Sequence, residues 1–147
     1  MLLNLLTGLP VMLLCLVMEA VFVSVCLRRY AMFKQSHQGR ETMWFATILL
    51  AMVMFLMLFS NFVQMCIWAA LFMLLGEFSD LGAALYFSAV NFATLGYGDI
   101  VMTNRWRLLG PLEAATGILM FGVSTAVMTA AVMDVLKFDS AKLRNGD

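Results

Sequence analysis

The residues with the clearest chemical potential form one short run, Thr94-Leu95-Gly96-Tyr97-Gly98-Asp99. Gly96 and Gly98 stand two residues apart, and glycine reaches backbone conformations that other residues avoid. A strand whose residues alternate in conformation can aim successive backbone carbonyls inward, where they replace the water shell of a passing cation. We expect Thr94 to add a hydroxyl at the inner mouth and Tyr97 to brace the strand against surrounding aromatic side chains. Asp99 is expected at the outer mouth, where acidic side chains raise the local cation concentration.

Four apolar stretches accompany this run, and their lengths predict different elements. Residues 9–27 are long enough to cross a bilayer, whereas residues 43–75, which carry no charge, predict one helix of roughly 50 Å. Residues 81–93 predict a helix of only about 20 Å, preceded by Ser79 and Asp80 as candidate N-caps. A short apolar helix that runs directly into a glycine-rich loop is typical of a re-entrant segment. Residues 108–136 predict a further span, with Pro111 in its first turn.

The composition supports a membrane protein and argues against several other classes. Hydrophobic residues make up 63% of the 147 residues and charged residues only 12%, far from a typical soluble domain. The net charge is zero, which gives no reason to expect a nucleic-acid partner. The three cysteines lie in apolar runs and predict packing, with neither disulfides nor a metal site. No catalytic constellation accompanies the single histidine, so we predict no enzyme and no organic cofactor.

The basic residues predict how the spans are oriented. The first connection carries Arg28, Arg29, Lys34 and Arg40, and the C-terminal tail is also basic. Such segments tend to stay in the cytoplasm, which predicts a multi-pass protein of the plasma or inner membrane with an external N-terminus, a cytoplasmic C-terminus and an external loop at residues 94–99. Two arginines, Arg105 and Arg107, oppose this assignment.

The run at residues 94–99 resembles the potassium-channel signature, with leucine where valine is commonest. Residues from about 43 to 135 resemble the pore domain of small prokaryotic potassium channels of the two-transmembrane ion-channel family, here with one additional N-terminal helix. The resemblance implies a homotetramer, because each chain supplies one of four filter strands. It also implies permeant K⁺ ions held by the backbone carbonyls of Thr94, Leu95, Gly96, Tyr97 and Gly98 and by the Thr94 hydroxyl. Ala93 and Val90 depart from the commonest pattern of residues that support the filter.

The predicted fold is an all-α membrane protein with the following parts. They are an N-terminal peripheral transmembrane helix (1–28), a cytoplasmic linker (29–42), a pore domain (43–136) and a short tail (137–147). Within the pore domain we predict an outer helix (43–75), a pore helix (81–93), the filter (94–99) and an inner helix (108–136).

The inner helix carries two further sets of candidate residues. Ile118, Phe121, Thr125 and Thr129 share one helix face, and the resemblance directs this face toward the cavity. The alternative is an ordinary helix–helix contact. Gly117 and Gly122 fit a gating hinge or a close approach of helices equally well.

Polar residues in the apolar stretches supply the remaining hypotheses. Glu19 lies near the middle of the first span, and Ser60, Asn61 and Gln64 lie near the middle of the second. A carboxyl in a membrane is costly without a partner, so we predict that a protonated Glu19 bonds to Asn61 or Gln64 and docks the extra helix. The alternative is a Glu19 that faces another subunit or an aqueous crevice.

Two other titratable residues have open roles. Glu113 suits a helix N-terminus, and it could also brace the back of the filter or pair with Arg105 or Arg107. His37 could sense pH, although a solvated loop histidine is the simpler interpretation.

The function predicted from these residues is passive, potassium-selective conduction. The alternatives are a weakly selective cation channel and a non-conducting regulatory or structural subunit. The partners expected are three identical subunits and membrane lipid.

Overall fold

A computed structural model describes residues 1–36 and 43–144, and every regular element among them is helical. The helices are α1 (Leu2–Ser36), α2 (Met43–Leu74), α3 (Leu81–Phe92) and α4 (Leu109–Arg144). Three of them contain stretches apolar and long enough to cross a membrane, namely Leu2–Met32, Ala46–Leu74 and Leu109–Lys137. The prediction of an all-α membrane fold with one short helix and three long ones is therefore confirmed.

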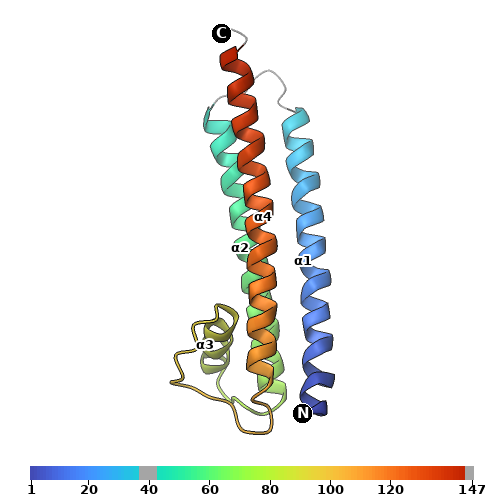
Figure 1. Ribbon diagram of the computed structural model, residues 1–147, viewed down its shortest axis with the longest axis vertical. Helices are drawn as coiled ribbons and strands as arrows, with labels where there is room; N and C mark the ends of the chain where they lie inside the picture. Colours follow the sequence, from blue (N-terminus) through green and yellow to red (C-terminus); the bar gives the residue numbers. More distant parts are fainter. Residues whose placement is uncertain (37–42, 145–147) are drawn as a thin grey trace.

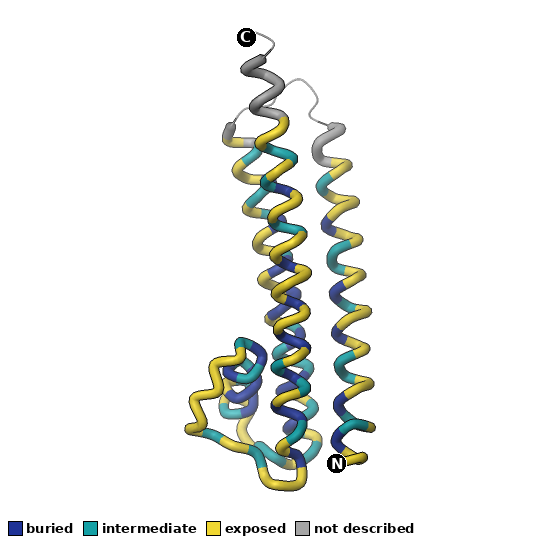
Figure 2. Tube along the Cα trace, in the orientation of Figure 1, coloured by how far each residue is buried: buried dark blue, intermediate teal, exposed yellow. Residues whose placement is uncertain are grey.

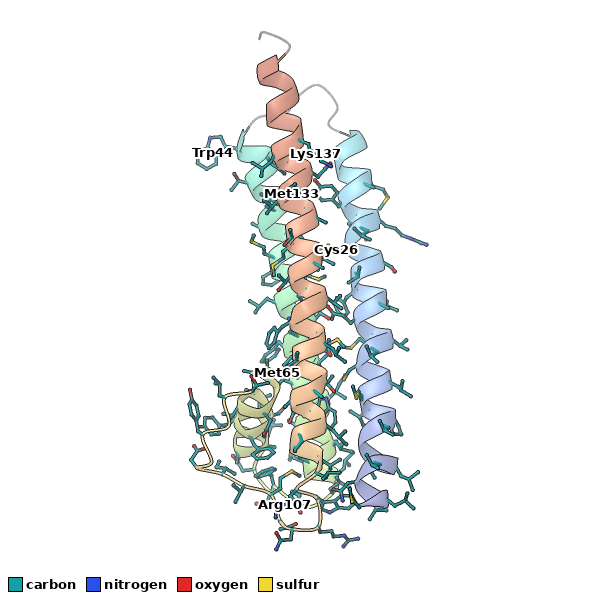
Figure 3. All side chains as sticks on the ribbon, in the orientation of Figure 1. Cys26, Trp44, Met65, Arg107, Met133 and Lys137 are labelled. Carbon is teal, nitrogen blue, oxygen red and sulfur yellow. The ribbon has the colours of Figure 1, made fainter. Side chains whose placement is uncertain are left out.

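The long helices run side by side, and the short α3 packs at one end of them (Figure 1). The N-terminus, α3 and the loop that follows α3 lie at this end, which we call the filter end, and the C-terminus lies at the opposite end. Residues 43–74 form one continuous helix, as predicted from their length. Figure 3 places Arg107 at the filter end and Lys137 toward the opposite end.

Two helices extend beyond the expected boundaries. α1 continues through residues 29–36, which we expected to be linker, and α4 continues past residue 136 to Arg144. Hydrophobicity marks only the part of a helix that crosses the membrane. Lysine and arginine are good helix formers, so the helix does not have to stop where the apolar stretch stops. His37, Arg40 and Glu41 lie outside the described residues.

α3 has a defined start. The Asp80 side chain accepts a hydrogen bond from the Ala83 backbone N–H at 2.8 Å, which makes Asp80 the N-cap. An N-cap carboxylate satisfies one of the free N–H groups of the first turn. Of the two predicted candidates, Asp80 caps the helix and Ser79 does not.

A cluster of buried apolar residues lies at the filter end, where α3 meets the long helices. Phe87 of α3 contacts Phe72 of α2 and Phe78 of the connecting turn, with ring centroids 5.4 and 5.1 Å apart. Trp68, Phe92 and Leu109 are fully buried in the same cluster. Figure 2 shows the buried residues concentrated where helices touch, whereas the outer faces of the long helices are exposed. The core therefore fixes α3, and with it the loop that α3 leads into.

Candidate functional site

The filter segment, residues 94–99, begins as the C-cap of α3. The Leu95 N–H donates to the Val90 carbonyl at 2.8 Å, and the Thr94 N–H donates to the Asn91 carbonyl at 2.8 Å. These two bonds form a Schellman motif, in which the residue after the cap adopts a left-handed conformation. Here that residue is Thr94, with φ at 58°. The pore helix therefore ends, and the filter segment begins, at a threonine in a conformation that usually requires glycine.

α2 ends in the same motif with the usual residue. The Gly76 N–H donates to the Met73 carbonyl at 3.0 Å, and the Glu77 N–H donates to the Phe72 carbonyl at 3.1 Å. Gly76 has φ at 76°. The ends of α2 and α3 have the same pattern of hydrogen bonds and differ in the left-handed residue, which is glycine in α2 and threonine in α3.

The backbone conformation alternates along the filter segment. Gly96 has φ at 56° and Gly98 has φ at 76°, so every second residue from Thr94 onward is left-handed. A Cβ atom added at either glycine would meet nothing within 4 Å in the chain. Both positions therefore favour glycine because of the left-handed backbone, and not because a side chain would lack space within one chain.

The outer end of the segment is held by a hydrogen bond that the sequence did not suggest. The Tyr86 hydroxyl on α3 donates to the Asp99 carboxylate at 2.6 Å. This bond holds the pKa of Asp99 below its ordinary value, since the bond favours the ionised form. Tyr86 therefore keeps an expected outer-mouth charge in place.

Tyr97 and the loop after the filter segment differ in how they are held within the chain. Tyr97 is 65% exposed in the single chain, so the expected bracing against aromatic side chains is not formed within the chain. The loop after the filter segment is instead tied to the end of α2, where the Glu77 carboxylate accepts bonds from the Thr103 N–H at 2.8 Å and from the Thr103 hydroxyl at 2.5 Å.

The back of the pore helix contacts α4 through Glu113. This side chain is fully buried and bonds to the Ser88 hydroxyl of α3, which lies 2.7 Å from the Met65 carbonyl of α2. Glu113 lies beyond the first turn of α4, so the expected contact with the helix N-terminus does not form. Arg105, one expected partner, lies over the Trp106 ring at 5.2 Å from its centroid. Val90 is buried and apolar, so this side of α3 offers no polar group at that position.

The two inner-helix glycines occupy different surroundings. A Cβ atom on Gly117 would lie 1.9 Å from the Phe92 carbonyl oxygen, whereas one on Gly122 would meet nothing within 4 Å. Gly117 thus permits α4 to approach the last residue of the pore helix. Of the two roles considered, close packing is the one that the Gly117 environment requires.

The four candidate cavity residues share an uncovered face of α4. Ile118, Phe121, Thr125 and Thr129 are all exposed in the single chain. Phe121 also contacts Phe92, with ring centroids 5.5 Å apart in an edge-to-face arrangement. The structure therefore brings part of this face next to the end of the pore helix.

The polar residues of the first two spans meet at mid-depth. The Glu19 carboxyl oxygen Oε2 accepts bonds from the Ser60 hydroxyl at 2.5 Å and from the Gln64 amide at 2.8 Å. Asn61 bonds to Ser124 of α4 at 3.1 Å and not to Glu19. Ser124, which the sequence did not single out, lies 3.4 Å from the second Glu19 oxygen. We call these five residues the polar cluster; it joins α1, α2 and α4.

α1 is also fastened near both of its ends. The Asn4 side-chain amide donates to the Arg105 carbonyl at 2.8 Å at the filter end. Toward the opposite end, the Tyr30 hydroxyl donates to the Asp134 carboxylate of α4 at 2.6 Å. The additional helix is therefore an integral part of the packed chain.

Comparison with known proteins agrees with this arrangement. A family model described as "Ion channel" matches residues 43–134, which include α2, α3, the filter segment and most of α4. Searches of curated proteins and of solved structures returned no match. The match covers well over half of the chain and leaves α1 outside it as an additional helix, as the resemblance predicted. This protein therefore belongs to the ion channel family with two pore-forming membrane helices.

Proposed function

We propose that the protein is a potassium-selective channel in which four identical chains surround one pore. The observation that carries the proposal is the left-handed backbone at Thr94, Gly96 and Gly98 directly after the pore helix. Such alternation turns successive carbonyl groups toward one side of the strand. Four such strands about an axis form rings of oxygen that replace the hydration shell of K⁺.

The tetramer is supported by what one chain leaves uncovered. Each residue of the filter segment is exposed, and so is the candidate cavity face of α4. A single strand cannot enclose an ion, so cyclic symmetry supplies the missing ligands. In this arrangement the C-terminal end of α3 points its partial negative charge at the cavity and favours a cation there.

The test is potassium flux through purified protein in liposomes. The expected result is flux down a potassium gradient, with much smaller flux when sodium replaces potassium. Equal sodium flux would establish the weakly selective channel, and no flux of either ion would favour the non-conducting subunit. Gly98→Ala is the matched variant, because it changes the filter backbone and adds a methyl group where one chain has open space.

Orientation has its own measurement. We propose an external filter end and a cytoplasmic C-terminus, in keeping with the basic residues of the first connection and the tail. Cysteines introduced singly at Thr103 and at Lys137 report the two sides, since an impermeant thiol reagent added to intact cells should label only the first. Labelling of the second alone would reverse the assignment.

A further inference from the structure

Three polar groups from three helices form a line behind the pore helix. They are the Glu113 carboxyl of α4, the Ser88 hydroxyl of α3 and the Met65 backbone carbonyl of α2. Glu113 and Ser88 are both 0% exposed. Figure 3 shows Met65 on α2 at the level of α3, well inside the span. This line of contacts is the only point at which a hydroxyl of α3 bonds to both α2 and α4 within the described residues.

The Ser88 hydroxyl cannot donate to the Met65 carbonyl and to Glu113 at the same time. Ser88 has one hydroxyl proton, and the Met65 carbonyl can only accept. If Ser88 donates to Met65, it has no proton left for Glu113. The contact between Ser88 and Glu113 is then a hydrogen bond only if the Glu113 carboxyl carries a proton and donates it to the Ser88 oxygen.

The surroundings of Glu113 favour the same protonation state. Its second oxygen, Oε2, is buried and has no hydrogen-bond partner in the described part of the chain. Within the same described residues no basic side chain forms an ion pair with it. The titratable group that faces it from α1 is the Cys15 thiol, and Glu19 lies farther along the same helix. An ionised carboxylate in this place would be a buried charge without a compensating partner, which proteins avoid. A neutral carboxylic acid leaves only one carbonyl oxygen unsatisfied.

We propose that Glu113 is held as a neutral acid and is a positioning residue for the filter segment. The Glu113 O–H donates a hydrogen bond to the Ser88 oxygen, and the Ser88 O–H donates one to the Met65 carbonyl. These two bonds fix α3 between α4 and α2. Ser88 lies one turn before Phe92 on α3, and Gly117 lies one turn after Glu113 on α4. The Glu113–Ser88 bond and the close approach of Gly117 to Phe92 together therefore set the register of α3 on α4. This role in conduction rests on the proposed channel function, whereas the protonation state does not.

Infrared difference spectroscopy on the reconstituted protein tests the protonation state. Subtraction of the Glu113→Gln spectrum from the unmodified one at neutral pH should leave the carbonyl stretch of a protonated carboxyl, shifted by deuterium exchange. Asp99→Asn is the matched control, because the pKa of Asp99 is lowered by its bond to Tyr86, so this variant should lose carboxylate bands and no carbonyl stretch of a protonated carboxyl. Loss of carboxylate bands in Glu113→Gln would overturn the proposal. This readout needs no ion flux, so it stands even if the protein does not conduct.

Flux measurements test the positioning role. Glutamine can donate an amide N–H to Ser88 and should retain most of the potassium flux, whereas Glu113→Leu has a similar size and no donor. We expect Glu113→Leu and Ser88→Ala to reduce flux or selectivity by about tenfold, as for the loss of a buried hydrogen bond. An equal loss in Glu113→Gln and Glu113→Leu would show that the donated proton does not matter. No loss in Glu113→Leu would remove the positioning role and leave the infrared result untouched.

Discussion

Thr94 adopts a conformation that costs a β-branched residue free energy. Gly76 occupies the equivalent position at the end of α2, and the hydrogen bonds of the two motifs match. We interpret the threonine as kept for its hydroxyl, which is expected at the inner mouth of the proposed pore; the packing of α3 holds the strained conformation in place.

Replacement of Thr94 separates stability from selectivity. Thr94→Gly should raise the free energy of unfolding by up to about 1 kcal/mol, because glycine relieves the left-handed strain. The same variant should lower the selectivity for K⁺ over Na⁺, since the hydroxyl is lost. Thermal unfolding in detergent and flux in liposomes measure the two quantities. Gly76→Ala is the matched control and should destabilise by about 1 kcal/mol; a stabilised Gly76→Ala would show that the conformation is not strained.

The hydrogen bond from Tyr86 is the largest cause of the lowered pKa of Asp99. The hydrogen bond lowers the pKa of Asp99, so the ionised carboxylate stabilises the folded state. This stabilisation is fully present above the ordinary aspartate pKa of about 3.9 and is lost as pH falls through the lower pKa of the folded protein. Tyr86→Phe should therefore allow Asp99 to take up its proton at a higher pH. Carbon-13 titration of labelled aspartate carboxyls checks this expectation. Identical midpoints in the two proteins would mean that the bond does not form in the membrane.

At the scale of helices, α4 and the pore helix meet where no side chain fits. Gly117→Ala would place a methyl group 1.9 Å from the Phe92 carbonyl oxygen, which is backbone and cannot rotate away. We expect the free energy of unfolding to fall by about 1–3 kcal/mol, the usual cost of overpacking, with reduced flux. Gly122→Ala is the control and should be neutral or slightly stabilising, since its Cβ meets open space. If the two variants behaved alike, the close approach would not exist in the folded channel.

The polar cluster decides how firmly α1 is docked. Glu19→Leu would leave Ser60 and Gln64 buried without their acceptor, which should cost about 1–3 kcal/mol. Glu19→Gln keeps an acceptor oxygen, so its free energy of unfolding should fall by less. Thermal unfolding of the two variants in one detergent gives the comparison, with the exposed Val17→Ala as a control. A Glu19→Leu protein as stable as the original would show that the polar cluster does not stabilise the docking of α1.

The sequence predicted elements and depths better than it predicted contacts. Helix lengths placed Glu19 and Gln64 at the same depth, and their bond follows from that. The Tyr86–Asp99 and Ser88–Glu113 bonds depend on how each helix is rotated about its axis. Helix rotation is set by packing in three dimensions, and apolar stretches this uniform leave almost no amphipathic pattern from which to read it. For the same reason the sequence left Asn61 and Gln64 as alternative partners of Glu19; in the structure Gln64 bonds to Glu19 and Asn61 bonds to Ser124.

At the scale of the whole molecule, subunit mixing tests the tetramer. If one altered filter strand blocks the pore, an equal mixture of unmodified and Gly98→Ala subunits leaves about one-sixteenth of tetramers unmodified. Potassium flux per protein should fall toward that fraction, measured in liposomes after co-expression with distinguishable tags. A fall to about one-quarter would indicate dimers. A fall to one-half would mean that each chain conducts alone, or that the chains do not mix.

The position of Glu19 has a consequence for how the chain is made. α1 leaves the ribosome before α2 and carries a carboxyl at mid-span, where the closely related aspartate costs about 2.5–3.5 kcal/mol on insertion scales. Its donors Ser60 and Gln64 are on α2, the next helix to be synthesised, and Ser124 follows only with α4. We therefore expect α1 to be retained at the insertion machinery until α2 arrives, so that both enter the bilayer as one hairpin. The pore helix and filter segment would then be delivered against an α1–α2 hairpin that is already assembled, and α4 would pack last.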